Sequence, residues 1–221
     1  MKGSSLLMAG FVWCGMAFAQ DGSRITILVY NYADIPVDTL VRAEDTAARI
    51  FRHAGIETVW RDCRADDFLP KHVPCPGPSA LSPGLRIQSR FQLVPNTVRR
   101  DTMGFSTGYL ATISLEYAED LARSSMGAVP EILGHIAAHE VGHVLLPGTR
   151  HTVSGIMRAR WSLNDWDLLR QGSLFFTPPQ AHFLRNELLV EAPKAPCPEI
   201  ASHCADTGRG ESALLVGRPA N

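Results

Sequence analysis

The amino-acid sequence predicts a mixed α/β domain built on a mostly parallel sheet. Short apolar runs rich in β-branched residues alternate with a helical segment in the first part of the chain. Two further helical segments follow the last of these runs. The chain has 221 residues, of which 45% are hydrophobic and 19% charged, which is enough for one buried core in a single domain.

The first elements are a strand, a helix and a second strand. Residues 24–31 form an apolar run suited to a buried strand, and apolar residues recur at helical spacing over residues 37–54. Gly55 is suited to close that helix, and residues 56–61 follow as the second strand. A proline-rich loop is expected over residues 66–84.

Two more strands with a short segment between them are expected next. Residues 85–94 place apolar side chains on alternate positions, as in a strand with one packed face, and residues 109–117 read as another strand. Residues 101–108 are polar and contain glycine. They form either an irregular edge of the sheet or a plain surface loop.

Two helices complete the domain. The first runs from about Pro130, a residue that suits the first helical turn, to about Leu146. The second begins at Thr177-Pro178-Pro179 and extends to about residue 190. Its side chains expected to face the core are Phe183, Leu184 and Leu188.

The first of these helices carries a metal-binding motif. His139-Glu140-Val141-Gly142-His143 places two imidazoles four residues apart on one helix face, with a carboxylate beside them. Pro147 and Gly148 end the helix, so that His151 can supply a third imidazole from the following loop. Such a set suits one Zn²⁺ ion and leaves a position for water, whose pKa zinc lowers to about 7. Glu140 is then placed to accept the proton of this water.

Ser154-Gly155-Ile156-Met157 follows as a turn of small residues ending in a methionine. With it, the chain resembles the metzincin clan of zinc metallopeptidases. The resemblance implies that His139, His143 and His151 are the zinc ligands, that Glu140 is the general base and that Met157 is the Met-turn residue. The glycine and the third histidine arrive two residues later than in the usual clan spacing, so no subfamily is assigned.

The resemblance also implies a fold and a mode of substrate binding. Metzincins have a mixed, mostly parallel twisted sheet with an edge strand, an active-site helix beneath the sheet and a C-terminal helix. Their edge strand binds an extended peptide through backbone hydrogen bonds. Residues 101–108 would supply this strand here.

Other ligands and pocket residues are compatible with the sequence. His135 lies on the same helix face as His139, but three ligands on successive turns would have to converge from about 12 Å of helix axis, which favours a packed, supporting role. Glu187 or Glu191 could instead supply a third ligand from the last helix. The side chains that could form a substrate-pocket wall, or pack in the core, are Trp161, Leu163 and Trp166.

The N-terminus reads as a targeting segment. Lys2 precedes an apolar stretch, and Ala17-Phe18-Ala19 has the small-x-small pattern of a cleavage site. Residues 1–19 are therefore expected to be a signal peptide, residues 20–191 the catalytic domain and residues 192–221 a loosely ordered tail. This organisation predicts an exported protein, either periplasmic or secreted.

The expected mature chain contains four cysteines, an even number that favours two disulfides in an exported protein. Four cysteines allow three pairings. Proximity in sequence favours Cys63 with Cys75 and Cys197 with Cys204.

Composition narrows the class of partner. The net charge of −1 and the lack of a long basic run argue against nucleic-acid binding, and no stretch after the first twenty residues could span a membrane. The predicted function is hydrolysis of peptide bonds in a peptide or protein substrate; no oligomeric state is indicated. Two alternatives stay open: a non-catalytic zinc-binding protein that binds a partner or a cell-wall component, and a peptidoglycan amide hydrolase. Glu140 favours an enzyme, because folding does not require a carboxylate there.

Overall fold

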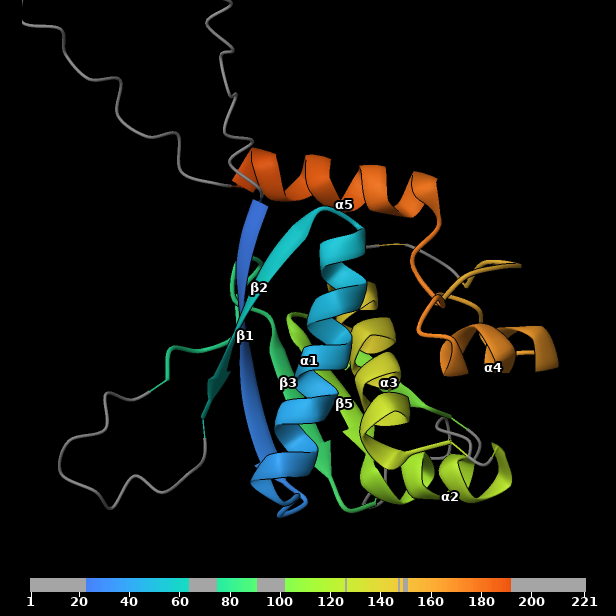
Figure 1. The fold of residues 1–221 in the computed structure, drawn as a ribbon. Coiled ribbons are helices and arrows are strands. Elements are labelled where there is room, and N and C mark those ends of the chain that lie inside the picture. Colours follow the sequence, from blue (N-terminus) through green and yellow to red (C-terminus); the bar gives the residue numbers. More distant parts are fainter. Residues whose placement is uncertain are drawn as a thin grey trace, which may run out of the picture.

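The computed structural model of this chain describes residues 23–63, 75–90, 102–125, 127–146, 148 and 151–191. Its centre is a five-stranded sheet with the strand order β2-β1-β3-β5-β4 (Figure 1). All neighbouring pairs are parallel except β4 and β5, which are antiparallel. The strands are β1 Ser23–Tyr32, β2 Ile56–Asp62, β3 Gly84–Gln88, β4 Gly104–Thr107 and β5 Leu110–Ser114. The predicted class, a mixed and mostly parallel sheet, is confirmed.

The β1-α1-β2 unit follows the sequence pattern closely. Helix α1 spans Val37–His53, and Gly55 after it adopts φ +82°, a conformation that side chains other than hydrogen disfavour. The C-terminal helix α5, Pro178–Glu191, secures this turn because the Arg185 guanidinium donates a hydrogen bond of 2.6 Å to the Ala54 carbonyl. The turn between α1 and β2 is thereby joined to α5.

Helices α1 and α3 pack together against one face of the sheet (Figure 1). Helix α3 spans Val129–Leu145, within one residue of the expected limits, and is buried over most of its length. Gly134 allows its close approach to α1, since a Cβ atom there would lie 2.5 Å from the Ala43 carbonyl oxygen. Helix α3 therefore lies deep in the core, beneath the sheet.

Two expected strands are shorter than predicted. The strand expected over residues 109–117 ends at Ser114, and helix α2, Leu115–Ser125, begins immediately afterwards. The Ser114 hydroxyl accepts a hydrogen bond from the Tyr117 amide, which is the interaction of a helix N-cap. The strand expected over residues 85–94 ends at Gln88. Its pairing with β5 stops because the chain becomes helical directly after β5. The residues of the expected strand beyond position 90 lie outside the described part.

Residues 101–108 contain the edge strand β4, so of the two expectations for this segment the strand is confirmed. Helix α4, Leu163–Arg170, was not expected. It begins with a capping box in which the Ser162 hydroxyl accepts from the Asp165 amide and the Asp165 carboxylate accepts from the Ser162 amide.

The expected orientation of Phe183 is wrong. Its side chain is 43% exposed, whereas Leu184 and Leu188 are buried as expected. Ala181 completes their buried stripe, and Phe183 falls on the adjoining surface of α5.

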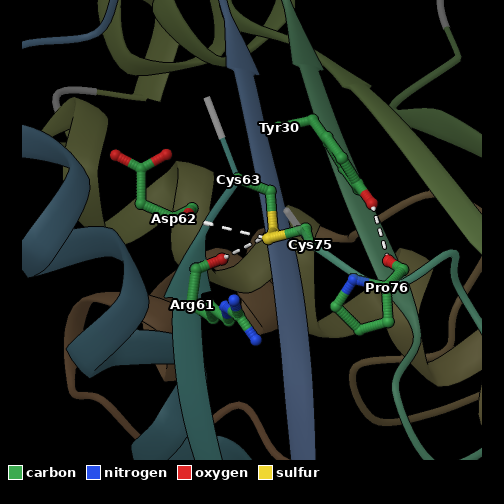
Figure 2. The surroundings of a disulfide bond; sticks show 6 residues. All are labelled: Tyr30, Arg61, Asp62, Cys63, Cys75 and Pro76. Atoms are coloured by element: carbon green, nitrogen blue, oxygen red, sulfur yellow. Dashed lines mark hydrogen bonds between the residues drawn. A yellow bond between two sulfur atoms is a disulfide. The ribbon is translucent and has the colours of Figure 1, made fainter. Parts of the chain in front are cut away.

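A disulfide joins Cys63, at the end of β2, to Cys75, with their Cα atoms 5.7 Å apart (Figure 2). This is one of the two expected pairs. The signal segment, the Cys197 and Cys204 pair and the expected tail lie outside the described residues. Among the described residues, no helix is both long and apolar enough to cross a membrane.

Candidate metal centre

Three histidines from two parts of the chain converge at the C-terminal half of α3. His139 and His143 come from the helix, and His151 comes from the loop that follows it. The His143 Nε2 atom lies 3.1 Å from His139 Nε2 and 3.2 Å from His151 Nε2. Nitrogens bound to one tetrahedral zinc ion at about 2.0–2.1 Å are separated by about 3.3 Å. All three ligand nitrogens lie within 4.8 Å of one another, and three imidazoles are a donor set that fits a zinc ion.

His139 is held in the orientation that a metal ligand requires. Its Nδ1 atom lies 2.7 Å from the Ile156 carbonyl oxygen. Because a carbonyl oxygen can only accept, Nδ1 carries the proton and Nε2 keeps its lone pair for a metal. Burial lowers the pKa of His139 to about 3, so the ring is neutral near pH 7.

Trp161 donates a second hydrogen bond to the same Ile156 carbonyl, from Nε1 over 3.1 Å. The indole also packs edge-on against the rings of His139 and Trp166. The carbonyl that orients His139 is therefore itself held by a buried side chain.

Met157 packs directly beneath the motif helix. A Cβ atom at Gly142 would lie 2.8 Å from the Met157 sulfur and 2.9 Å from a ring carbon of Phe176. Only glycine leaves room for these two side chains against the helix. The motif residue Gly142 thus determines how closely the Ile156–Met157 turn approaches the histidines.

Glu140 lies beside the histidines and beneath the edge strand. Its Oε1 is 4.0 Å from His139 Nε2, and only 3% of the residue is exposed. Burial raises the pKa of Glu140 to about 8. The strand β4 lies against it, because a Cβ atom at Gly104 would be 2.7 Å from Glu140 Cγ. A cation held by the histidines would favour the ionised carboxylate and oppose this effect of burial.

The histidines and Glu140 open into a cleft of about 530 Å³ between β4 and the segment after Met157. Its volume is within the range of ordinary small-molecule and peptide-residue sites. Besides the three histidines and Glu140, its lining consists of Thr102, Met103, Gly104, Phe105, Ser106, Ala159 and Arg160. The arrangement can hold a metal-activated water, a buried proton acceptor and an extended chain within one space.

The other suggested ligands do not join this cluster. His135 is buried one helical turn earlier, with Nδ1 2.6 Å from the Glu131 carbonyl of its own helix. Among the described residues, Glu187 belongs to no group of possible metal ligands. Glu191 ends helix α5, and its side chain lies outside the described part.

Residues 102–106 line the cleft, and they lie in the segment 101–108 that was expected to supply the substrate-binding edge strand. The rest of the cleft wall was not identified from the sequence. Gly104 and Arg160 line the cleft, whereas the suggested wall residues Trp161, Leu163 and Trp166 do not. Trp161 is instead buried, and Leu163 is 85% exposed. No local signal predicts the contact of Gly104 with Glu140, because this contact joins distant segments. The sequence shows Arg160 three residues after Met157, but it does not predict that this side chain points into the cleft.

No family model matches the chain, and the search of curated proteins found no match to its sequence. The chain is similar in structure to archaemetzincin from Methanopyrus kandleri, with a TM-score of 0.49 and 15% identity over 77% of this chain and 99% of that one. A zinc-dependent peptidase from Methanocorpusculum labreanum gives a TM-score of 0.49 and 13% identity over 72% and 99%. Archaemetzincin from Archaeoglobus fulgidus gives 0.47 and 18% over 72% and 99%. The chemistry of the site therefore has to come from its own residues.

Proposed function

We propose that the chain is an exported zinc-dependent metallopeptidase of metzincin type. The observation that carries this proposal is a buried carboxylate, Glu140, set beside three converging imidazoles at the base of a cleft. A protein that merely retained the metal would have no use for this costly buried group. His139, His143 and His151 are the proposed ligands, and Met157 is the proposed Met-turn residue.

In the proposed reaction, zinc when bound supplies Lewis-acid activation of a water molecule and of the substrate carbonyl. Glu140 accepts the proton of the attacking water and then delivers it to the leaving amine. The Ile156 carbonyl keeps His139 in its ligating orientation. The substrate lies along β4 in the cleft, so that the scissile bond faces Glu140.

Export is supported by the disulfide between Cys63 and Cys75, which suits an oxidising compartment. It is also supported by the apolar N-terminal segment with its small-x-small pattern.

The deciding experiment compares the wild-type protein with Glu140→Gln and with the matched control Glu187→Gln, whose carboxylate lies outside the metal cluster. Zinc content and hydrolysis of a quenched-peptide panel are measured on each. We expect one zinc per chain in all three and a loss of about 10²–10⁴-fold in kcat for Glu140→Gln alone. The same panel includes peptidoglycan fragments. Cleavage of these fragments without cleavage of peptides would assign an amide hydrolase, and zinc binding with no cleavage would assign a binding protein.

A further inference from the structure

A second pocket lies on the face of the sheet opposite to α1 and α3. In the register of the sheet, Tyr30 of β1 lies beside Arg86 of β3, and Tyr32 lies beside Gln88. Side chains alternate between the two faces of a strand, and the neighbours Val29 and Ile87 are buried in the core. The tyrosines, Arg86 and Gln88 therefore share the outer face.

This pocket has a volume of about 400 Å³ and shares no residue with the metal cleft. Its lining consists of Tyr30, Tyr32, Pro78, Arg86, Gln88 and Leu110. Gly84 leaves the space for part of this wall, since a Cβ atom there would lie 2.7 Å from Leu110 Cδ1 and 2.9 Å from Pro78 Cγ.

The disulfide holds the segment that closes one side of the pocket. Figure 2 shows Cys63 and Cys75 bonded next to Pro76, whose carbonyl oxygen lies 3.5 Å from the Tyr30 hydroxyl. Farther along, the Leu28 amide donates to the Pro83 carbonyl over 2.9 Å. The wall containing Pro78 is thus fixed to β1 at both ends.

Arg86 is the feature that indicates a ligand. Arg86 is half-buried, yet within the described part of the chain its guanidinium forms no hydrogen bond and no ion pair. Gln88 is also half-buried and has no hydrogen-bond partner among these residues. Among the described residues, neither side chain has a nitrogen or oxygen that is both fully buried and unsatisfied, so their N–H donors stay open towards the pocket. The five N–H donors of Arg86 and the amide of Gln88 can therefore bind a ligand that carries an acceptor.

The charge of this face matches an anion. On the strands and on residues 75–83, the one carboxylate among the described outer-face residues is that of Glu57, which lies 3.5 Å from Arg52. Within the pocket Arg86 is the sole charged residue. A single guanidinium in a pocket that also holds two tyrosines suits a singly charged planar carboxylate better than a doubly charged phosphate.

We propose that this pocket binds a carboxylate group carried on an aromatic or apolar body. Arg86 holds the carboxylate, Gln88 donates to it, and the body packs between the tyrosines and Leu110. The site does not depend on the peptidase proposal, because it shares no residue with the metal centre.

The test measures binding by heteronuclear NMR and calorimetry on the zinc-loaded protein, with acetohydroxamate present to block the metal. The probes are N-acetylphenylalanine, benzoate and N-acetylphenylalanine amide, which lacks the charge. We expect saturable binding of at least one acid and none of the amide. A preference for N-acetylphenylalanine identifies a peptide C-terminus as the source of the carboxylate, and a preference for benzoate identifies a small free acid.

Arg86→Gln is expected to weaken binding by about 10–100-fold. The matched control is Arg24→Gln, which lies on the same face of the sheet but outside the pocket and should leave the affinity unchanged. The NMR spectrum of each variant reports whether it is folded. Equal binding of the amide, equal affinity of the folded Arg86→Gln variant, or no binding of either acid would overturn the proposal.

Discussion

The two halves of helix α3 carry the same kinds of residue and do different things. Each half has a buried histidine whose Nδ1 meets a backbone carbonyl, and each has a glycine in close contact with another segment. Yet His139 faces a cleft with two further imidazoles, whereas His135 lies in the core. Spacing along the helix therefore does not decide which histidine can be a ligand.

The difference lies in what each histidine contacts. The carbonyl that holds His135 belongs to Glu131, one turn earlier in the same helix. The Nε2 atom of His135 is buried and lacks a hydrogen-bond partner among the described residues. The carbonyl that holds His139 belongs to Ile156, on a segment that also carries Met157 beneath the helix. A ligand site thus requires a second segment that orients the ring and leaves its other nitrogen facing open space.

The largest expected effect comes from removing one histidine from each half. His139→Ala should lower zinc affinity by more than about 100-fold, since it removes a proposed ligand rather than a supporting group. His135→Phe should retain one zinc per chain, because it replaces a ring that contacts no other ligand candidate. Metal competition assays on both proteins measure the affinities. Equal zinc loss in the two variants would contradict the distinction between the halves.

Alanine at the two glycines should separate folding from function. In Gly134→Ala the new methyl meets the backbone of α1, which cannot move away, and the free energy of unfolding should fall by about 1–3 kcal/mol. In Gly142→Ala the methyl meets the Met157 sulfur, which belongs to a flexible side chain, and the edge of the Phe176 ring, but none of these nearest atoms is a backbone atom of another segment. This variant should lose the proposed peptidase activity and zinc affinity in greater proportion than stability. Denaturant unfolding and activity per folded molecule distinguish the two results.

The dependence of the free energy of unfolding on pH tests the burial of His135 separately from the metal centre. Burial lowers its pKa to about 4, with Arg49 opposing the charged form and Glu131 favouring it. The folded pKa is below the unfolded value of about 6.5, so this contribution to stability is complete above pH 6.5 and is lost as pH falls towards 4. At pH 5 the loss is about 2 kcal/mol. His135→Phe should remove this part of the acid dependence. The free energy of unfolding is measured for the metal-free wild type and the metal-free variant at pH 7 and at pH 5. Between these pH values the wild type should lose about 2 kcal/mol more than the variant. Equal losses in the two proteins would contradict the expectation.

The sequence was sufficient where the determining contacts are local. Periodicity located α1 and α3 to within one or two residues, and the spacing of His139 and His143 identified the shared helix face. The capping box at Ser162 and Asp165 was also a local signal, although it was not used to predict α4.

Long-range contacts account for what the sequence could not provide. Ser114 lies at the end of β5, where its hydroxyl donates a hydrogen bond of 3.5 Å to the Ser89 carbonyl just after β3. The contact of Gly104 with Glu140 joins β4 to α3, and the shared Ile156 carbonyl joins Trp161 to His139. None of these pairs follows a period or a motif, because strand order and helix packing determine them.

The smallest expected effect concerns that shared carbonyl. Trp161→Phe keeps an aromatic ring in the core but removes the Nε1 donor to the Ile156 oxygen. We expect zinc affinity to fall by about tenfold, the lower end of the range for partners that orient a ligand. Trp166→Phe is the matched control, since its ring packs on Trp161 without a bond to this carbonyl. A tenfold loss in both variants would show that ring packing, and not the hydrogen bond, supports His139. A loss confined to Trp161→Phe would show that the orientation of His139 depends on how firmly its carbonyl partner is held.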